Sequence, residues 1–283
     1  MVGRTIKKWW PVFVLPTFAA FVIGFLWPFI WGIYLSFCKF TTVQDVTFVG
    51  FSNYSKILLD NTFSHSFWLT VVFAFVSSIL INVLAFFIAL ALTKGYRGTN
   101  AFRTVFFMPN LIGGIVLGYI WQTLLNGLLS KWGQPLLSLS ARNGFIGMLI
   151  LLMWQQIGYM MIIYVAGLNN VSPDLIEAAQ IDGAGPVQLF FKVTIPLLTP
   201  TIFFVMITSI ISGFQVFDVI YMMIGKTNPA YANTQTVVML FYRQAFDYGY
   251  KGYAAAISIL IFAVIMLVTV IQMIGQKKWV NYD

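Results

Sequence analysis

Six long apolar stretches constrain this chain more than any other feature of its sequence. They cover, in chain order, residues 12–37, 67–92, 104–125, 145–168, 193–224 and 253–275. A helix needs about 20 largely apolar residues to cross a bilayer, because the hydrocarbon layer is about 30 Å thick and the helix rises about 1.5 Å per residue. We therefore predict an all-α integral membrane protein with six transmembrane helices. The long fifth stretch is expected to be tilted or to lie partly outside the hydrocarbon.

The composition agrees with a membrane location and excludes several other functions. The 283 residues are 60% apolar and only 8% charged, which leaves too few polar side chains to cover a water-soluble globule. The single cysteine, Cys38, cannot form an intrachain disulfide, and one histidine, His65, adds too few ligands for a zinc site. We expect no metal site and no cofactor in this chain.

The basic residues indicate how the chain is oriented. All sixteen lie in short runs or singly beside the apolar stretches, nine on the side of the N-terminus and seven on the other. This placement favours membrane lipid over nucleic acid as a partner, and the positive-inside rule puts both termini in the cytoplasm. No long linker or polar block interrupts the series, which predicts a single transmembrane domain over residues 1–283.

The predicted cytoplasmic loop 169–192 is unusual because it holds three of the eight acidic residues. Ser172 can cap a helix that begins at Pro173 and stops at Gly183, and a second helix can begin at Pro186. The short first helix combines small, apolar and acidic residues, which suits docking into the groove of a partner. On these grounds alone, a solvated helical hairpin that joins two spans is an equal alternative.

A resemblance distinguishes these two interpretations. The loop carries, in order, Glu177, Ala178, Ala179, Gly183, Val193, Ile195 and Pro196. This spacing resembles the EAA loop of permease subunits in binding-protein-dependent ATP-binding-cassette importers, and Ile181 to Ala184 resembles its carbohydrate, or maltose-type, branch. The similarity covers nearly the whole chain. One departure is that residues 225–229 replace the T-x-G-G-P loop that is frequent in the family.

The resemblance implies a fold and a set of partners. The fold is that of a type I importer permease in a bacterial or archaeal cytoplasmic membrane. The partners are a second permease subunit that is a different homologous chain, two ATP-binding-cassette ATPase subunits that bind ATP and magnesium, and an extracytoplasmic solute-binding protein. This chain would have no catalytic residue. The residues that it would use for coupling to the ATPase are Glu177, Ala178, Ala179, Asp182, Gly183 and Ala184.

Polar groups inside the apolar stretches indicate where the solute passes, because such groups are costly in hydrocarbon and face the interior of a bundle. Amide and hydroxyl groups can bind sugar hydroxyls, and aromatic faces can cover a pyranose ring. The predicted pathway residues are Trp154, Gln155, Gln156, Tyr159, Ser212, Gln215 and Asp218. For any one of them, hydrogen bonding between helices is an equal alternative.

The predicted function is therefore the permease subunit of a sugar or oligosaccharide importer that works by alternating access. An importer of the same family for a glycerol phosphate is one alternative. An ion-coupled secondary transporter is another, but it calls for intramembrane carboxylates, and only Asp218 qualifies. A membrane-embedded enzyme would need a nucleophile with a base, or a metal cluster, within the spans, and the sequence shows neither.

Overall fold

A computed structural model describes residues 2–42, 44–95, 97–224 and 231–279. Residues 225–229, where the sequence departs from the loop pattern of the family, lie outside the described residues. The chain divides into two compact units, one formed by residues 1–60 and 241–262 and the other by residues 61–240 and 263–283. Each unit is described in turn.

Among the described residues, five helices are long and apolar enough to cross a membrane, or six if one bent pair counts as a single span. The five are Trp9–Ser36, Asn61–Leu92, Ala141–Asn169, Pro186–Gln215 and Lys251–Lys277. The bent pair consists of Thr99–Leu111 and Gly114–Lys131, which meet at an angle of 101°. The all-α membrane fold predicted from the apolar stretches is confirmed.

The first unit combines residues 1–60 with residues 241–262, which include the first part of the last helix. Its elements are α1 (Val2–Phe21), the π-helical segment η1 (Val22–Leu26), α2 (Trp27–Ser36), β1 (Cys38–Lys39), β2 (Thr47–Phe48), α3 (Ser52–Leu59), the π-helical segment η3 (Arg243–Asp247) and the first part of α14 (Lys251–Trp279). The strands pair antiparallel, with Cys38 opposite Phe48. Asn53 ties α3 to this turn, because its side-chain amide donates to the carbonyl oxygens of Ser36 and Cys38, both at 2.9 Å.

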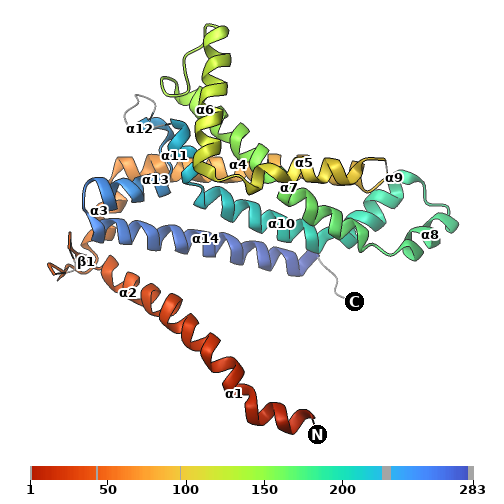
Figure 1. Cartoon of the computed structure of the whole chain (residues 1–283), viewed down its shortest axis with the longest axis horizontal. Helices are drawn as coiled ribbons and strands as arrows, with labels where there is room; N and C mark the ends of the chain where they lie inside the picture. Colours follow the sequence, from red (N-terminus) through yellow and green to blue (C-terminus); the bar gives the residue numbers. More distant parts are fainter. Residues whose placement is uncertain (1, 43, 96, 225–230, 280–283) are drawn as a thin grey trace. The chain divides into compact units, whose positions relative to one another are not determined.

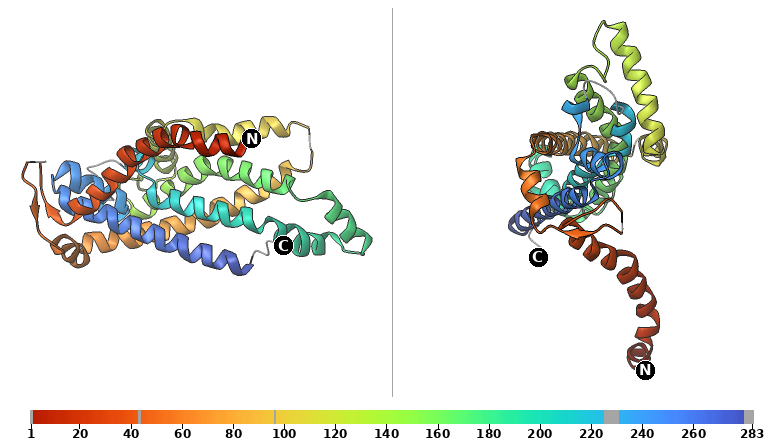
Figure 2. Two further views of the ribbon diagram at one scale, coloured as in Figure 1. Left: turned by 90° about the horizontal axis from the view of Figure 1, so that it is seen from below. Right: turned by 90° about the vertical axis from the view of Figure 1, so that its left-hand side faces the viewer.

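The second unit is a helical bundle. Its elements are α4 (Asn61–Leu92), α5 (Thr99–Leu111), α6 (Gly114–Lys131), α7 (Ala141–Asn169), α8 (Pro173–Ile181), α9 (Pro186–Leu189), the π-helical segment η2 (Phe190–Thr194), α10 (Ile195–Gln215), α11 (Asp218–Ile224), α12 (Tyr231–Thr234), the start of α13 (Val237–Tyr242) and the end of α14. Helices α4, α7 and α10 pack against one another, α5 packs along α7, and α6 packs against α11. Helices α8 and α9 lie at one end of this bundle (Figures 1 and 2).

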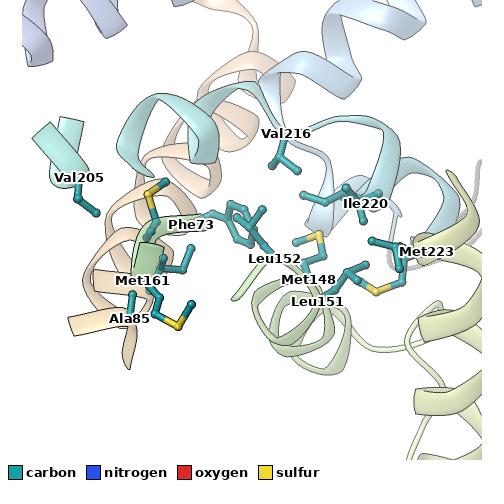
Figure 3. Packing of buried hydrophobic residues seen from close by; sticks show 14 of the residues in the cluster. Phe73, Ala85, Met148, Leu151, Leu152, Met161, Val205, Val216, Ile220 and Met223 are labelled. Carbon is teal, nitrogen blue, oxygen red and sulfur yellow. The ribbon is translucent and has the colours of Figure 1, made fainter. Parts of the chain in front are cut away.

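The core of the bundle is apolar and continuous. Figure 3 shows part of it, with Met148, Leu151 and Leu152 of α7 between Phe73 of α4 and Ile220 of α11. Because lipid is as apolar as these side chains, close packing rather than exclusion from water holds such helices together. The side chains on the buried faces of the helices must therefore fit closely against one another.

The helix predicted over residues 104–125 is not continuous. It breaks between α5 and α6, where Ile112 and Gly113 have extended backbone angles (ψ 134° and 135°). Pro109, inside the last turn of α5, has no N–H to donate, so the helix lacks one backbone hydrogen bond shortly before the break. The run of apolar residues continues across the break, so hydropathy alone gives no sign of it.

The fifth stretch also departs from the predicted single helix over residues 193–224. Helix α10 ends at Gln215, Val216 is extended (ψ 126°), and a separate helix, α11, begins at Asp218. At the other end, the backbone passes through a π-helical segment, η2, which ends two residues before Pro196. Pro196 lacks the N–H of a regular helical bond, and a π-helical turn is one way to accommodate that loss.

Candidate functional site

Five of the seven predicted pathway residues line one cavity in the second unit. The cavity has a volume of about 310 Å³, and its described lining consists of Leu152, Gln155, Gln156, Ser212, Gln215, Val216, Phe217, Asp218 and Val219. The first three come from one face of α7, because residues three and four apart lie on the same side of a helix. The amides, the hydroxyl and the carboxylate therefore converge from α7 and from the junction of α10 and α11.

The helix breaks between Gln215 and Asp218, and both residues line this cavity. In a continuous helix the side chain of Asp218 would lie near that of Gln215, three residues before it, and farther around the axis from that of Ser212. Instead, the extended Val216 redirects the chain, and the backbone N–H of Val219 donates to Asp218 Oδ1 at 2.9 Å. The carboxylate also lies against Gly114, the first residue of α6, where the positive end of the helix dipole favours a negative group.

Trp154 and Tyr159 are not part of the cavity lining. The ring of Trp154 makes an edge contact with that of Trp121 on α6, with centroids 5.3 Å apart. Tyr159 is partly exposed on α7. Of the predicted pathway residues, the structure therefore brings the amide, hydroxyl and carboxylate groups together at one cavity and places the two aromatic side chains outside its lining.

A separate group of buried polar side chains forms hydrogen bonds between helices and does not line the cavity. Tyr164 donates its hydroxyl to Asn82 at 2.7 Å, and the amide of Asn82 donates to the hydroxyl of Ser209 at 2.8 Å. The hydroxyls of Ser78 and Ser209 lie 2.6 Å apart. These bonds join α4, α7 and α10 and satisfy one another, as is typical of polar side chains between membrane helices. The cavity residues differ because they face open volume.

The predicted coupling segment forms a short helix with a well-defined stop. Helix α8 begins at Pro173, as the sequence predicts, although the side chain of Ser172 makes no capping bond. At its end Gly183 has a positive φ of 85°, its N–H donates to the carbonyl of Gln180 at 3.0 Å, and Ala184 donates to Ala179 at 2.9 Å. These two bonds form a Schellman motif, which favours glycine because a side chain is strained at positive φ.

Helix α8 presents the predicted coupling residues on its surface. Glu177, Ala178, Asp182 and Gly183 are exposed, while Ala179 and Ala184 are partly buried. Ile181, an apolar side chain, is 86% exposed at the end of the helix. An acidic group, small residues and an uncovered apolar side chain therefore lie together at the end of the bundle.

A further cavity, which the sequence did not indicate, lies in the first unit and is lined in part by Lys39 and Lys56. These lysines lie on the short elements β1 and α3, far apart in the sequence from the other lining residues at 244–253, so no local pattern could have identified the cavity. Among the described residues, no three histidine, cysteine, aspartate or glutamate side chains are grouped so that they could hold a metal ion.

The chain is similar to known transport proteins along most of its length. It is 34% identical to the probable starch degradation products transport system permease protein AmyD of Thermoanaerobacterium thermosulfurigenes, with 96% of each protein covered. It is 30% identical to the sn-glycerol-3-phosphate transport system permease protein UgpA of Brucella abortus, again with 96% of each covered.

The fold is also found in a solved structure. A chain of a bacterial ABC transporter involved in the import of the acidic polysaccharide alginate matches with a TM-score of 0.83 and 20% identity, over 99% of both chains. Residues 81–279 match the family described as binding-protein-dependent transport system inner membrane component. Since this match covers more than half of the chain, the protein belongs to the family of inner membrane components of binding-protein-dependent transport systems.

Proposed function

We propose that this chain carries a sugar or oligosaccharide across the cytoplasmic membrane of a bacterium or archaeon, with both termini in the cytoplasm. The chain itself is a multi-pass, non-catalytic permease component of an ATP-binding-cassette importer. Two partner ATPase subunits would bind ATP and magnesium, a second and different permease would complete the pathway, and an external binding protein would deliver the solute.

The observation that carries the choice of solute is the cavity between α7 and the α10–α11 junction. Three side-chain amides and one hydroxyl face it, which suits the many hydroxyl groups of a neutral sugar. Among its described lining residues the one charged group is the carboxylate of Asp218, so a phosphate there would meet a like charge without a basic partner. The lining therefore favours a sugar over a glycerol phosphate.

Helix α8 would couple this cavity to ATP. Glu177 and Asp182 are exposed beside Ile181, and this surface fits a groove with basic and apolar groups in a partner ATPase. When the ATPase pair closes on ATP, α8 would move with it. Helices α7 and α10, which flank α8 in the chain and pack on each other, would transmit that motion to the cavity residues that they carry.

We expect purification of the tagged chain from its own membrane to yield an ATPase and a second permease. An importer works only as this assembly, whereas an ion-coupled carrier would function alone. The measurement is the mass of the purified complex and its ATP hydrolysis, with Glu177→Lys as the variant and the exposed Gln134→Lys as a matched control. A chain that transports in vesicles without any ATPase would contradict the proposal.

We expect the double variant Gln155→Leu and Gln215→Leu to raise the KM for sugar uptake about 30-fold, because each lost hydrogen bond changes affinity by about 1 kcal/mol. Leucine keeps a similar volume and only removes the amides. The exposed Gln134, which lies outside the cavity lining, provides the control Gln134→Leu. An unchanged KM in the double variant would show that the solute does not pass these residues.

A further inference from the structure

A cavity in the first unit shares no residue with the cavity assigned to sugar passage. It has a volume of about 460 Å³ and is lined by Lys39, Phe40, Thr41, Asn53, Lys56, Asp60, Gln244, Tyr250, Gly252 and Tyr253. All of these residues belong to one compact unit, so the cavity has a defined shape. Its mixture of basic, amide and aromatic groups suits a ligand with an anionic head.

Two lysines supply the positive charge of this cavity. Lys39 ends β1, and Lys56 lies on α3, whose Asn53 holds the helix against the β1 turn. Both side chains are exposed, and within the described residues no hydrogen bond or ion pair holds either ammonium group. The one lining carboxylate, Asp60, is engaged by the hydroxyl of Tyr253 at 2.7 Å. The lining therefore carries one more positive than negative charge.

A second carboxylate, that of Asp45, is also engaged in hydrogen bonds. Asp45 is not part of the lining, and it accepts hydrogen bonds from the hydroxyl and backbone N–H groups of Thr41 and Thr42. These bonds stabilise the ionised form and lower the pKa of Asp45. Its oxygens are directed at the turn, so it stabilises the loop that carries Lys39.

The cavity lies where two candidate spans end. The first span ends at Ser36, three residues before Lys39, and the last span begins at Lys251, next to Gly252 and Tyr253. Spans leave the hydrocarbon at the level of the lipid headgroups, where tyrosine and lysine side chains are favoured. The cavity is therefore at the depth of lipid phosphates.

Helix α3 also presents an apolar surface, as a helix in the membrane interface requires. Leu58 and Leu59, two and three residues after Lys56, are 77% and 85% exposed, while Asn53 and Ile57 are buried on the other side of the helix. A short helix with a polar anchor and two exposed leucines can lie in the interface, with its apolar side chains in the acyl region. This arrangement favours an amphiphile over a soluble anion.

We propose that this cavity binds the phosphate of an anionic phospholipid, with Lys39 and Lys56 as its charged ligands. The ammonium groups would bind the phosphate, and the amide of Gln244 could donate to a headgroup hydroxyl. The inference does not depend on which solute the importer carries.

The test is binding of phosphatidylglycerol to the purified full-length chain in a non-ionic detergent, measured by native mass spectrometry. Each lysine near an anionic headgroup changes affinity about fivefold, so the double variant Lys39→Gln and Lys56→Gln should bind about 25-fold more weakly. The matched control is Lys131→Gln and Lys251→Gln, which removes two exposed lysines outside the lining. Lys39→Arg and Lys56→Arg should retain binding.

Two further ligands complete the test. Phosphatidylcholine shows whether binding needs an anionic headgroup, and sn-glycerol 3-phosphate shows whether it needs a lipid. Binding of phosphatidylglycerol alone that depends on Lys39 and Lys56 supports the proposal. It is overturned if phosphatidylcholine binds equally well, if sn-glycerol 3-phosphate binds in its place, or if the control pair loses as much affinity. It is also overturned if the arginine variant folds, by its elution volume and helical content, yet binds no lipid.

Discussion

Substitution of Gly183 by valine should reduce both transport and transport-linked ATP hydrolysis about tenfold or more, while the chain still inserts in the membrane. Gly183 has a φ of 85°, where a β-branched side chain is strained by about 1–2 kcal/mol or more. No heavy atom lies within 4 Å of the position that its Cβ would occupy, so the effect is on the backbone and not on packing. The strain would be relieved by opening the Schellman bonds to Gln180 and Ala179, which define the end of α8.

The neighbouring Gly185 provides a close control for this variant. Its φ is −70°, which any residue can adopt, and no heavy atom lies within 4 Å of the position that a Cβ would occupy. Valine therefore fits there without strain. The measurements are the amount of chain in the membrane, sugar uptake, and ATP hydrolysis stimulated by the loaded binding protein. Uptake that is unchanged in Gly183→Val, or lost equally in Gly185→Val, would contradict a role for the defined end of α8 in coupling.

The spans and helix α8 could be predicted from sequence because they depend on local properties. A long apolar run must be helical in a bilayer, since every backbone polar group has to be paired within the segment. Helix α8 begins at Pro173 and ends before Gly183 because proline suits the first turn and glycine suits a positive φ after the last. These signals lie within a few residues of the features that they determine.

The two breaks in the helices could not be predicted in the same way. Ile112 and Val216 are apolar residues within apolar runs, and both have extended backbones. A helix would be equally compatible with their hydropathy, so hydropathy alone does not show where α5 and α10 end. The path of the chain between Gln215 and Asp218 depends on one of these breaks.

The two candidate sites differ in how much the sequence says about them. Gln155 and Gln156 stand out because amides are costly in hydrocarbon, and the structure places both at a cavity. Lys39 and Lys56 lie on the short elements β1 and α3, outside the apolar stretches, where lysine is ordinary. Their proximity to Tyr253 arises only when the two ends of the chain form one compact unit.

Replacement of Gly158 by alanine should destabilise the bundle by about 3 kcal/mol or more, which is a large effect for one methyl group. A Cβ at this position on α7 would overlap the carbonyl oxygen of Phe106 and lie 2.8 Å from the Cα of Phe107, both on α5. A side chain could rotate away from the new methyl group, but the backbone of α5 cannot. Helices α5 and α7 would have to separate, with loss of the contacts that hold them together.

The matched control is Gly127→Ala on α6, where no heavy atom lies within 4 Å of a built Cβ. Alanine has the higher helix propensity, by about 1 kcal/mol, so this variant should be as stable as the parent or slightly more stable. The measurement is the apparent melting temperature of the purified chain in detergent, which we expect to fall by about 10 °C for Gly158→Ala. If Gly158→Ala melted with the parent, α5 would not pack against α7 at this backbone contact, and the bend that directs α6 toward α11 would need another support.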